Sequence, residues 1–236
     1  MDDLEWATSK RPDWAQKQNT STYETKMGWY ARQVDTEVYG EYLKGESGRV
    51  LDLPCGTGRF LRLIEAEHQR FQPIGADYSP NMMTIAQRTT TSPLVRCDGF
   101  FLPFQPQSFD VVLCTRLVFH YHAPLDLFHS FHRILRPGGV LAFDSLNRLS
   151  LRHLLAAPFN TVRPTQGKQL WFASFAQVQG LLSDCGFQVE QRTSRYILPT
   201  RAYRFLAKFL IRFLATVEPA VPESRRVLSY WKVRKV

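Results

Sequence analysis

The chain has 236 residues, 44% of them apolar, which suits one α/β domain with a sizeable core rather than two independent domains. It contains no apolar run long enough to cross a membrane, and the acidic start MDDLEW is unlike a signal peptide, so we expect a cytoplasmic protein. The net charge of +9 is concentrated in residues 192–236, which hold eleven Lys/Arg and two Asp/Glu. The first 191 residues carry equal numbers of basic and acidic side chains.

The N-terminal part divides into an arm and a helix. Residues 1–22 are polar and show no clear period, so we interpret them as an arm preceding a single domain at 23–236. Residues 23–43 are predicted to form a helix because apolar and aromatic side chains recur there at helical spacing. These side chains are Met27, Tyr30, Ala31, Val34, Val38, Tyr39 and Tyr42.

The run VLDLPCGTGRF, residues 50–60, combines a short apolar strand, an acidic residue near its end and a small-residue turn that opens a helix. Gly56 and Gly58 supply the backbone freedom that a tight turn under a ligand needs. The following helix directs free N–H groups at that ligand. Leu61 breaks the dinucleotide pattern GxGxxG, and Arg59-Phe60 replaces the Lys-Ser/Thr of a phosphate-binding loop. A dinucleotide-binding turn and a phosphate-binding loop are therefore both excluded.

Two further predicted strands are followed by acidic residues. The second strand ends in Asp77, and Ser79-Pro80 is a favourable start for the next helix. A carboxylate offers two acceptor oxygens and a ribose diol offers two donors, so a carboxylate such as Asp77 can accept both hydroxyls of a ribose. Asp77 lies 25 residues after Asp52, a spacing typical of ribose-binding acids. The third strand is followed by Asp98-Gly99.

Phe109–Cys114 is predicted to be the central strand, and ligands of open parallel sheets bind beyond the carboxyl ends of the strands. The residues that follow it are therefore expected near the reacting groups: Thr115, Arg116, Phe119 and His120. The fifth strand is predicted at residues 140–144, so Ser145 and Asn147 should lie at the same edge as substrate contacts.

No metal site is predicted. His120, His122, His129 and His132 lie within thirteen residues, but no inward Asp or Glu completes a ligand set. Cys55, Cys97, Cys114 and Cys185 contain no CxxC pair, so neither zinc nor a disulfide framework is indicated.

The C-terminal part contains one sharply amphipathic predicted helix, at about residues 201–217. Its cations fall on one face: Arg201, Arg204, Lys208 and Arg212. Two interpretations remain open. The helix either packs on the sheet with its cations in water, or rests on anionic lipid near a lipophilic acceptor as a peripheral membrane contact.

Four ordered stretches resemble the motifs of class I S-adenosylmethionine (SAM) dependent methyltransferases, most closely the type 11, ubiquinone/menaquinone branch. They are VLDLPCGTGRF, FQPIGADYSPNMM, LPFQPQSFDVVLCTRLVFHY and HRILRPGG, with Pro54 in place of the family's first motif glycine. The resemblance implies a Rossmann-like sheet of strand order 3-2-1-4-5-7-6 sandwiched by helices, with an antiparallel last strand. It also implies that the helix at 23–43 lies over the cofactor pocket as a lid, with Tyr23 and Tyr30 either as lid aromatics or as core residues.

The resemblance assigns site residues by motif position. SAM is the implied cofactor, bound by Asp52, Pro54, Cys55, Gly56, Gly58, Asp77, Tyr78, Met82, Asp98, Gly99 and Thr115, with Asp98 accepting from the adenine amino group. The acceptor contacts are Tyr23, Tyr30, Arg116, Phe119, Ser145 and Asn147. His120 is the candidate general base, because an unperturbed histidine pKa of about 6.5 suits neutral pH.

The function expected from this resemblance is methyl transfer from SAM to a small-molecule acceptor, including a lipophilic one, by in-line displacement. Two alternatives stay open: an RNA methyltransferase that uses the basic C-terminal segment, and a non-catalytic SAM-binding partner protein. The Asn/Asp-Pro-Pro-Tyr/Phe arrangement of nucleic-acid amino methyltransferases is absent, which disfavours the first alternative. Neither the methylated atom nor the oligomeric state follows from the sequence.

Overall fold

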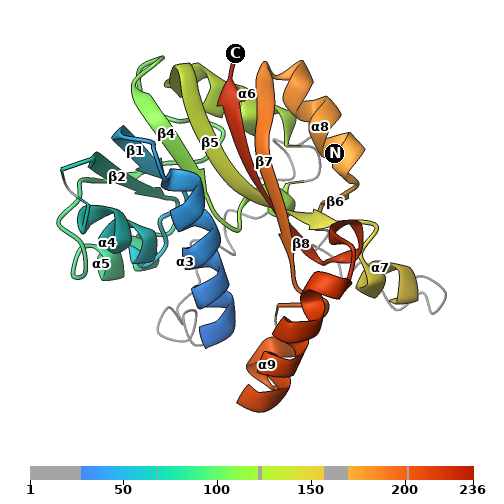
Figure 1. Cartoon of the computed structure of the whole chain (residues 1–236). Helices are drawn as coiled ribbons and strands as arrows, with labels where there is room; N and C mark the ends of the chain where they lie inside the picture. Colours follow the sequence, from blue (N-terminus) through green and yellow to red (C-terminus); the bar gives the residue numbers. More distant parts are fainter. Residues whose placement is uncertain (1–27, 68, 122–123, 157–169, 201) are drawn as a thin grey trace.

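A computed structural model describes residues 28–67, 69–121, 124–156, 170–200 and 202–236 (Figure 1). The strands are β1 (Gly48–Asp52), β2 (Phe71–Asp77), β3 (Leu94–Arg96), β4 (Phe109–Cys114), β5 (Leu135–Asn147), β6 (Phe172–Ala173), β7 (Phe187–Arg195) and β8 (Leu228–Lys235). The α-helices are α3 (Trp29–Leu43), α4 (Arg59–Glu65), α5 (Pro80–Ala86), α6 (Leu125–Ile134), α7 (Leu151–Ala156), α8 (Phe175–Asp184) and α9 (Lys208–Val217). Short 3₁₀ turns occur at Val118–His120, Ala202–Arg204, Glu218–Ala220 and Glu223–Arg225.

All eight strands belong to one sheet of order β3-β2-β1-β4-β5-β8-β7, with β6 pairing off this path with β5. In this order, the neighbouring strands β3, β2, β1, β4 and β5 pair in parallel. By contrast, β8 pairs antiparallel with both β5 and β7. Apart from the two-residue β6, this is the predicted order 3-2-1-4-5-7-6 with its antiparallel last strand. The α/β Rossmann-like fold is confirmed, and β6 is an addition that the sequence did not indicate.

Alternate residues of each strand point to opposite faces, so the sheet has two cores. One core packs strand residues such as Val50, Val111, Val140 and Tyr230 against α3 and α4. The other packs Leu51, Val112, Leu141 and Trp231 against α6 and α8. The strands are apolar on both faces because helices cover both faces, as is usual for parallel sheets.

The fifth strand is longer than predicted. It continues through Ser145 to Asn147, because β8 pairs with it as far as Leu146 and β6 pairs with its last two residues. The placement of Ser145 and Asn147 after the strand was therefore wrong. Both residues are paired within the sheet: Ser145 with Ser229 of β8, and Asn147 with Ala173 of β6.

The predicted helix at 201–217 is interrupted. A 3₁₀ turn at Ala202–Arg204 precedes α9, and Ala207 is extended with a ψ of 147°. Tyr203 causes this break, because its side chain turns inward and its hydroxyl oxygen accepts a hydrogen bond from the Ile197 N–H at 3.2 Å. Arg201 and the whole of the 1–22 arm lie outside the described residues.

None of the helices in the described part of the chain is long and apolar enough to cross a membrane.

Candidate functional site

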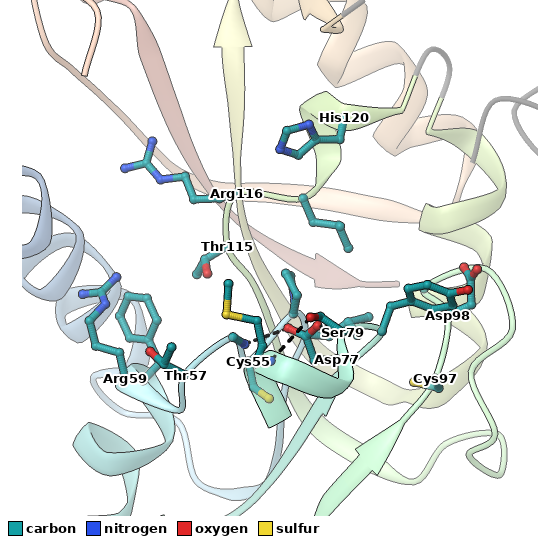
Figure 2. A pocket seen from close by; sticks show the side chains of 18 of the residues that line it. Cys55, Thr57, Arg59, Asp77, Ser79, Cys97, Asp98, Thr115, Arg116 and His120 are labelled. Carbon is teal, nitrogen blue, oxygen red and sulfur yellow. Dashed lines mark hydrogen bonds between the residues drawn. The ribbon is translucent and has the colours of Figure 1, made fainter. Parts of the chain in front are cut away.

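A pocket lies at the carboxyl ends of β1, β2, β3 and β4, where the chain leaves each strand toward the next helix (Figure 2). Its lining comprises Arg32 of α3; Leu53, Pro54, Cys55, Gly56, Thr57, Arg59 and Phe60 after β1; Asp77, Tyr78, Ser79 and Met82 after β2; Cys97, Asp98 and Gly99 after β3; and Thr115, Arg116, Leu117, His120 and Tyr121 after β4. The pocket therefore collects residues from four separate strand ends, as the rule for open parallel sheets predicts.

The turn after β1 is held by the carboxylate at the tip of β2. Asp77 accepts hydrogen bonds from the backbone N–H groups of Gly56 and Ser79, each at 2.8 Å (Figure 2). Gly56 and Gly58 have φ values of 55° and 82°, a left-handed region that side chains rarely adopt. Asp77 is 6% exposed, so its charge is presented to the pocket from a nearly buried position.

The side of the pocket beyond β3 is also acidic. Asp98 accepts a hydrogen bond from the Phe100 N–H at 3.0 Å, which fixes the turn that follows β3. Tyr78 and Met82 add an aromatic and an apolar surface, and Gly99 brings bare backbone to the lining. This side can accept hydrogen bonds from donors on a flat polar ring and pack against its faces.

The opposite side is basic and rests on a buried charge network. The Arg116 guanidinium donates to Asp35 of α3 at 2.6 Å and lies 3.2 Å from an oxygen of Asp144 on β5. Asp35 also accepts from the Tyr230 hydroxyl at 2.5 Å and pairs with Arg59 at 3.4 Å. The network joins α3 to β4, β5, β8 and the start of α4 beside the pocket.

Arg116 has an unusual backbone conformation. Its φ is 59°, in the left-handed region, and its N–H donates to Asp144 at 2.8 Å. Such strain costs of order 1–3 kcal/mol and persists only where surrounding contacts hold it. Asp144 therefore holds both the backbone and the side chain of Arg116, which directs this residue toward the pocket.

The network also shifts the pKa values of its members. Burial raises the pKa of Asp144 to about 6, although the Arg116 charge opposes this. For Arg116 itself burial is the largest effect and lowers the pKa, but Asp35, Tyr230 and Asp144 together outweigh burial and the net shift is upward. Burial lowers the pKa of Arg59. Because its pKa is raised, the Asp144 carboxyl takes up a proton more readily than an exposed aspartate does.

A short 3₁₀ turn after β4 carries His120 into the lining. Its ring centroid lies 4.8 Å from that of Phe119. The neighbouring Tyr121 is almost fully buried and packs edge-on against Phe100 at 4.7 Å. Figure 2 shows His120 and Arg116 on the same side of the pocket, away from Asp77.

Most of the predicted cofactor residues meet in this pocket: Pro54, Cys55, Gly56, Asp77, Tyr78, Met82, Asp98, Gly99 and Thr115. Asp52 and Gly58 are outside the lining. Asp52 is 1% exposed at the end of β1, and this burial raises the pKa of its carboxyl well above the ordinary value. Gly58 serves as the left-handed residue that starts α4.

Of the predicted acceptor contacts, Arg116 lines the pocket and four described residues do not. Ser145 accepts from the Trp231 indole N–H at 2.9 Å, and the Asn147 amide donates to the carbonyls of residues 224 and 226. Phe119 belongs to the sheet's core. Tyr30 stacks on Tyr203 with ring centroids 5.2 Å apart. Tyr23 lies outside the described residues.

Sequence reasoning missed Asp35, Asp144, Arg59 and Arg32. For Asp35 a signal existed, because it lies four residues after Ala31 and four before Tyr39, both on the predicted buried face of the helix. An acidic residue on such a face requires a cationic partner. That partner is Arg116, which lies 81 residues further along the chain. The spacing of residues along the sequence does not predict such a distant contact.

Comparison with known proteins agrees with this architecture. The model of a family described as a methyltransferase domain matches residues 51–143. Demethylmenaquinone methyltransferase of Staphylococcus epidermidis is 30% identical over 131 residues, which cover 52% of this chain and 54% of that protein. A probable tRNA methyltransferase of Mus musculus is 29% identical over 119 residues, covering 47% of this chain and 26% of that protein. The chain thus spans about half or less of these relatives.

A solved structure shows the same fold. Phosphoethanolamine N-methyltransferase 2 of Haemonchus contortus superposes with a TM-score of 0.70 at 20% sequence identity, covering 98% of this chain and 60% of that chain. A sheet of this order with its pocket at the strand ends defines the class I SAM-dependent methyltransferase fold. The family match adds that residues 51–143, which build most of the pocket, resemble a methyltransferase domain.

Proposed function

We propose that the chain transfers a methyl group from SAM to a small-molecule acceptor bound beside His120 and Arg116. The observation that carries this proposal is the pairing of two strand-tip carboxylates, Asp77 and Asp98, with the glycine turn at Gly56 in one pocket. A nucleoside offers a ribose diol and an adenine amino group as donors, which matches two separate acidic acceptors.

The charges of the lining suit the whole cofactor. SAM carries a nucleoside at one end and an amino-acid carboxylate at the other. The carboxylates of the pocket stand after β2 and β3, whereas Arg32 lies on α3, Arg59 at the start of α4 and Arg116 after β4. Asp77 would hold the ribose, Asp98 the adenine, and Arg32 and Arg59 the carboxylate end. Tyr78 and Met82 would flank the ring.

When bound, SAM supplies the activated methyl group and its leaving group. The chain's residues then have to orient the acceptor in line with the methyl group and keep water from it. His120 is placed to receive a proton from an oxygen or nitrogen acceptor. Arg116, held by Asp35 and Asp144, is a fixed cation at the same side that can pair with an anionic group of the acceptor.

The small-molecule class is supported by the quinone-modifying relative and by the absence of the Asn/Asp-Pro-Pro-Tyr/Phe arrangement. RNA methylation is the second candidate, favoured by the tRNA-modifying relative and by the basic C-terminal segment.

All four cysteines are unpaired and buried, which supports a cytoplasmic location for the reaction, because thiols persist in reducing compartments.

The test uses SAM labelled in its methyl group and three fractions from cells that express the protein: lipids, RNA and polar metabolites. Label entering the lipid or polar fraction with wild type, but not with Asp77→Ala, would support the proposal. The control is Asp184→Ala, which removes an exposed carboxylate at the end of α8, at the opposite edge of the sheet. Label confined to RNA would favour the second candidate. SAM binding without label transfer to any fraction would favour a non-catalytic partner protein.

A further inference from the structure

The surface around α9 carries the most exposed aromatic side chains in the described part of the chain. Phe205 and Phe209 are each 75% exposed, and Phe213 is 61% exposed. Phe209 and Phe213 lie four residues apart, so they share one face of α9. Phe205 lies before the extended Ala207 that precedes α9, and these three exposed side chains are called the stripe. An exposed apolar stripe of this kind marks a contact with another apolar phase.

The stripe points away from the protein core. Ile211 is the inward residue of α9, at 1% exposure. Phe209 and Phe213 are two residues before and after it, so each lies about 160° around the helix from Ile211. Figure 1 shows α9 projecting beyond the sheet, which leaves this outer face open.

Each phenylalanine of the stripe follows a cation. The pairs are Arg204-Phe205, Lys208-Phe209 and Arg212-Phe213. The three cations are exposed, and no Asp or Glu occurs from residue 202 to 217. The Arg204 guanidinium lies over the Phe205 ring, 4.3 Å from its centroid. The face therefore combines an apolar stripe with an uncompensated positive edge.

This face is fixed relative to the pocket. It lies between the end of β7 and the start of β8, at the same edge of the sheet as the carboxyl ends that line the pocket. Tyr203 is buried and stacks on Tyr30 of α3, the helix whose Arg32 lines the pocket. A surface bound by α9 would therefore face the acceptor side of the molecule.

We propose that α9 and the turn before it bind an anionic lipid membrane, with the three phenylalanines at the acyl boundary and the three cations among the head groups. A short helix with a basic edge and an aromatic face is the pattern of interfacial helices. The surface lies outside the cofactor pocket, so this inference stands or falls independently of methyl transfer.

The experiment measures binding of the full chain to vesicles by co-sedimentation. One set of vesicles is phosphatidylcholine with phosphatidylglycerol, and the other is phosphatidylcholine alone. We expect binding to the anionic vesicles that weakens as salt rises. Changing Arg204, Lys208 and Arg212 to Gln should reduce it by about a hundredfold, because each cation near an anionic surface contributes about fivefold. Phe209→Ser with Phe213→Ser should reduce it at least about tenfold.

Two matched controls separate this surface from general effects. Changing Lys44, Arg62 and Arg88 to Gln removes the same charge from exposed positions elsewhere. Phe101→Ser removes another aromatic side chain that is 60% exposed. Both controls should bind vesicles as wild type does. Unchanged SAM affinity in each variant would show that it is folded.

Insertion is tested with Phe213→Trp, whose emission should shift to the blue and be quenched by brominated lipid when anionic vesicles are added. Wild-type protein that ignores anionic vesicles at low salt would overturn the proposal. Equal losses in the α9 variants and the matched controls would also overturn it. Salt-dependent binding to RNA, lost in the α9 cation variant without any vesicle binding, would assign the surface to nucleic acid instead.

Discussion

Replacing Asp77 with alanine tests both the cofactor site and the turn that builds it. In the structure the Asp77 carboxylate accepts two backbone hydrogen bonds at 2.8 Å, from Gly56 and Ser79, and is 6% exposed. In the proposed complex it also accepts from the ribose hydroxyls. A hydrogen bond involving a charged group is worth about 1.5–3 kcal/mol, so SAM affinity should fall roughly 10- to 150-fold in Asp77→Ala.

The substitution should also lower stability, and the two effects must be separated. The Ser79 N–H is buried and would lose its acceptor, which costs about 1–3 kcal/mol in the free energy of unfolding. Ser79→Ala is the matched variant, since it weakens the start of α5 while leaving the Asp77 carboxylate in place. Denaturant unfolding should place both variants below wild type, but calorimetry should show a large loss of SAM affinity only in Asp77→Ala.

A ligand change isolates the ribose contact itself. S-adenosylhomocysteine and its 2′,3′-dideoxy analogue should differ strongly in affinity for wild type and much less for Asp77→Ala, because the variant has no carboxylate for the hydroxyls to meet. If the analogue is weakened equally in both proteins, Asp77 does not contact the ribose. Its role would then be confined to holding the Gly56 turn.

The remaining predictions concern the acceptor side, the buried network and a helix start. His120→Ala should lower turnover by roughly 10²- to 10⁴-fold while SAM affinity stays within a few-fold of wild type. His129→Ala, on the exposed side of α6, should leave turnover unchanged. Near-wild-type turnover in His120→Ala would leave His120 a packing residue. Burial raises the pKa of Asp144 to about 6, so wild type should be most stable relative to Asp144→Asn below about pH 4 and lose roughly 3 kcal/mol of that advantage as pH rises through 6. Urea unfolding at several pH values measures this difference, and a pH-independent difference would refute it. Ser174→Ala should cost about 1 kcal/mol of stability, because Ser174 and Gln177 form a reciprocal cap at the start of α8; an unchanged unfolding midpoint would contradict this.

Local patterns determined a large part of this protein. The turn at Gly56, the acidic strand tips at Asp77 and Asp98 and the cap at Ser174 each depend on residues close together in the chain. Such features follow from backbone freedom, capping and strand alternation, which act over a few residues. For this reason the turn and the acidic strand tips could be predicted from the residues themselves, whereas the sheet order and the cofactor roles followed from the resemblance to class I methyltransferases.

Tertiary structure decided what depends on distant partners. β5 extends to Asn147 because β8, far along the chain, pairs with it, and this pairing draws Ser145 away from the acceptor edge. Tyr203 breaks the predicted amphipathic helix because it packs on Tyr30 of another helix. Asp35 meets Arg116 only once α3 lies on the sheet. Hydrogen bonding and burial stabilise such contacts only in the folded chain, so the spacing of residues along the sequence does not predict them.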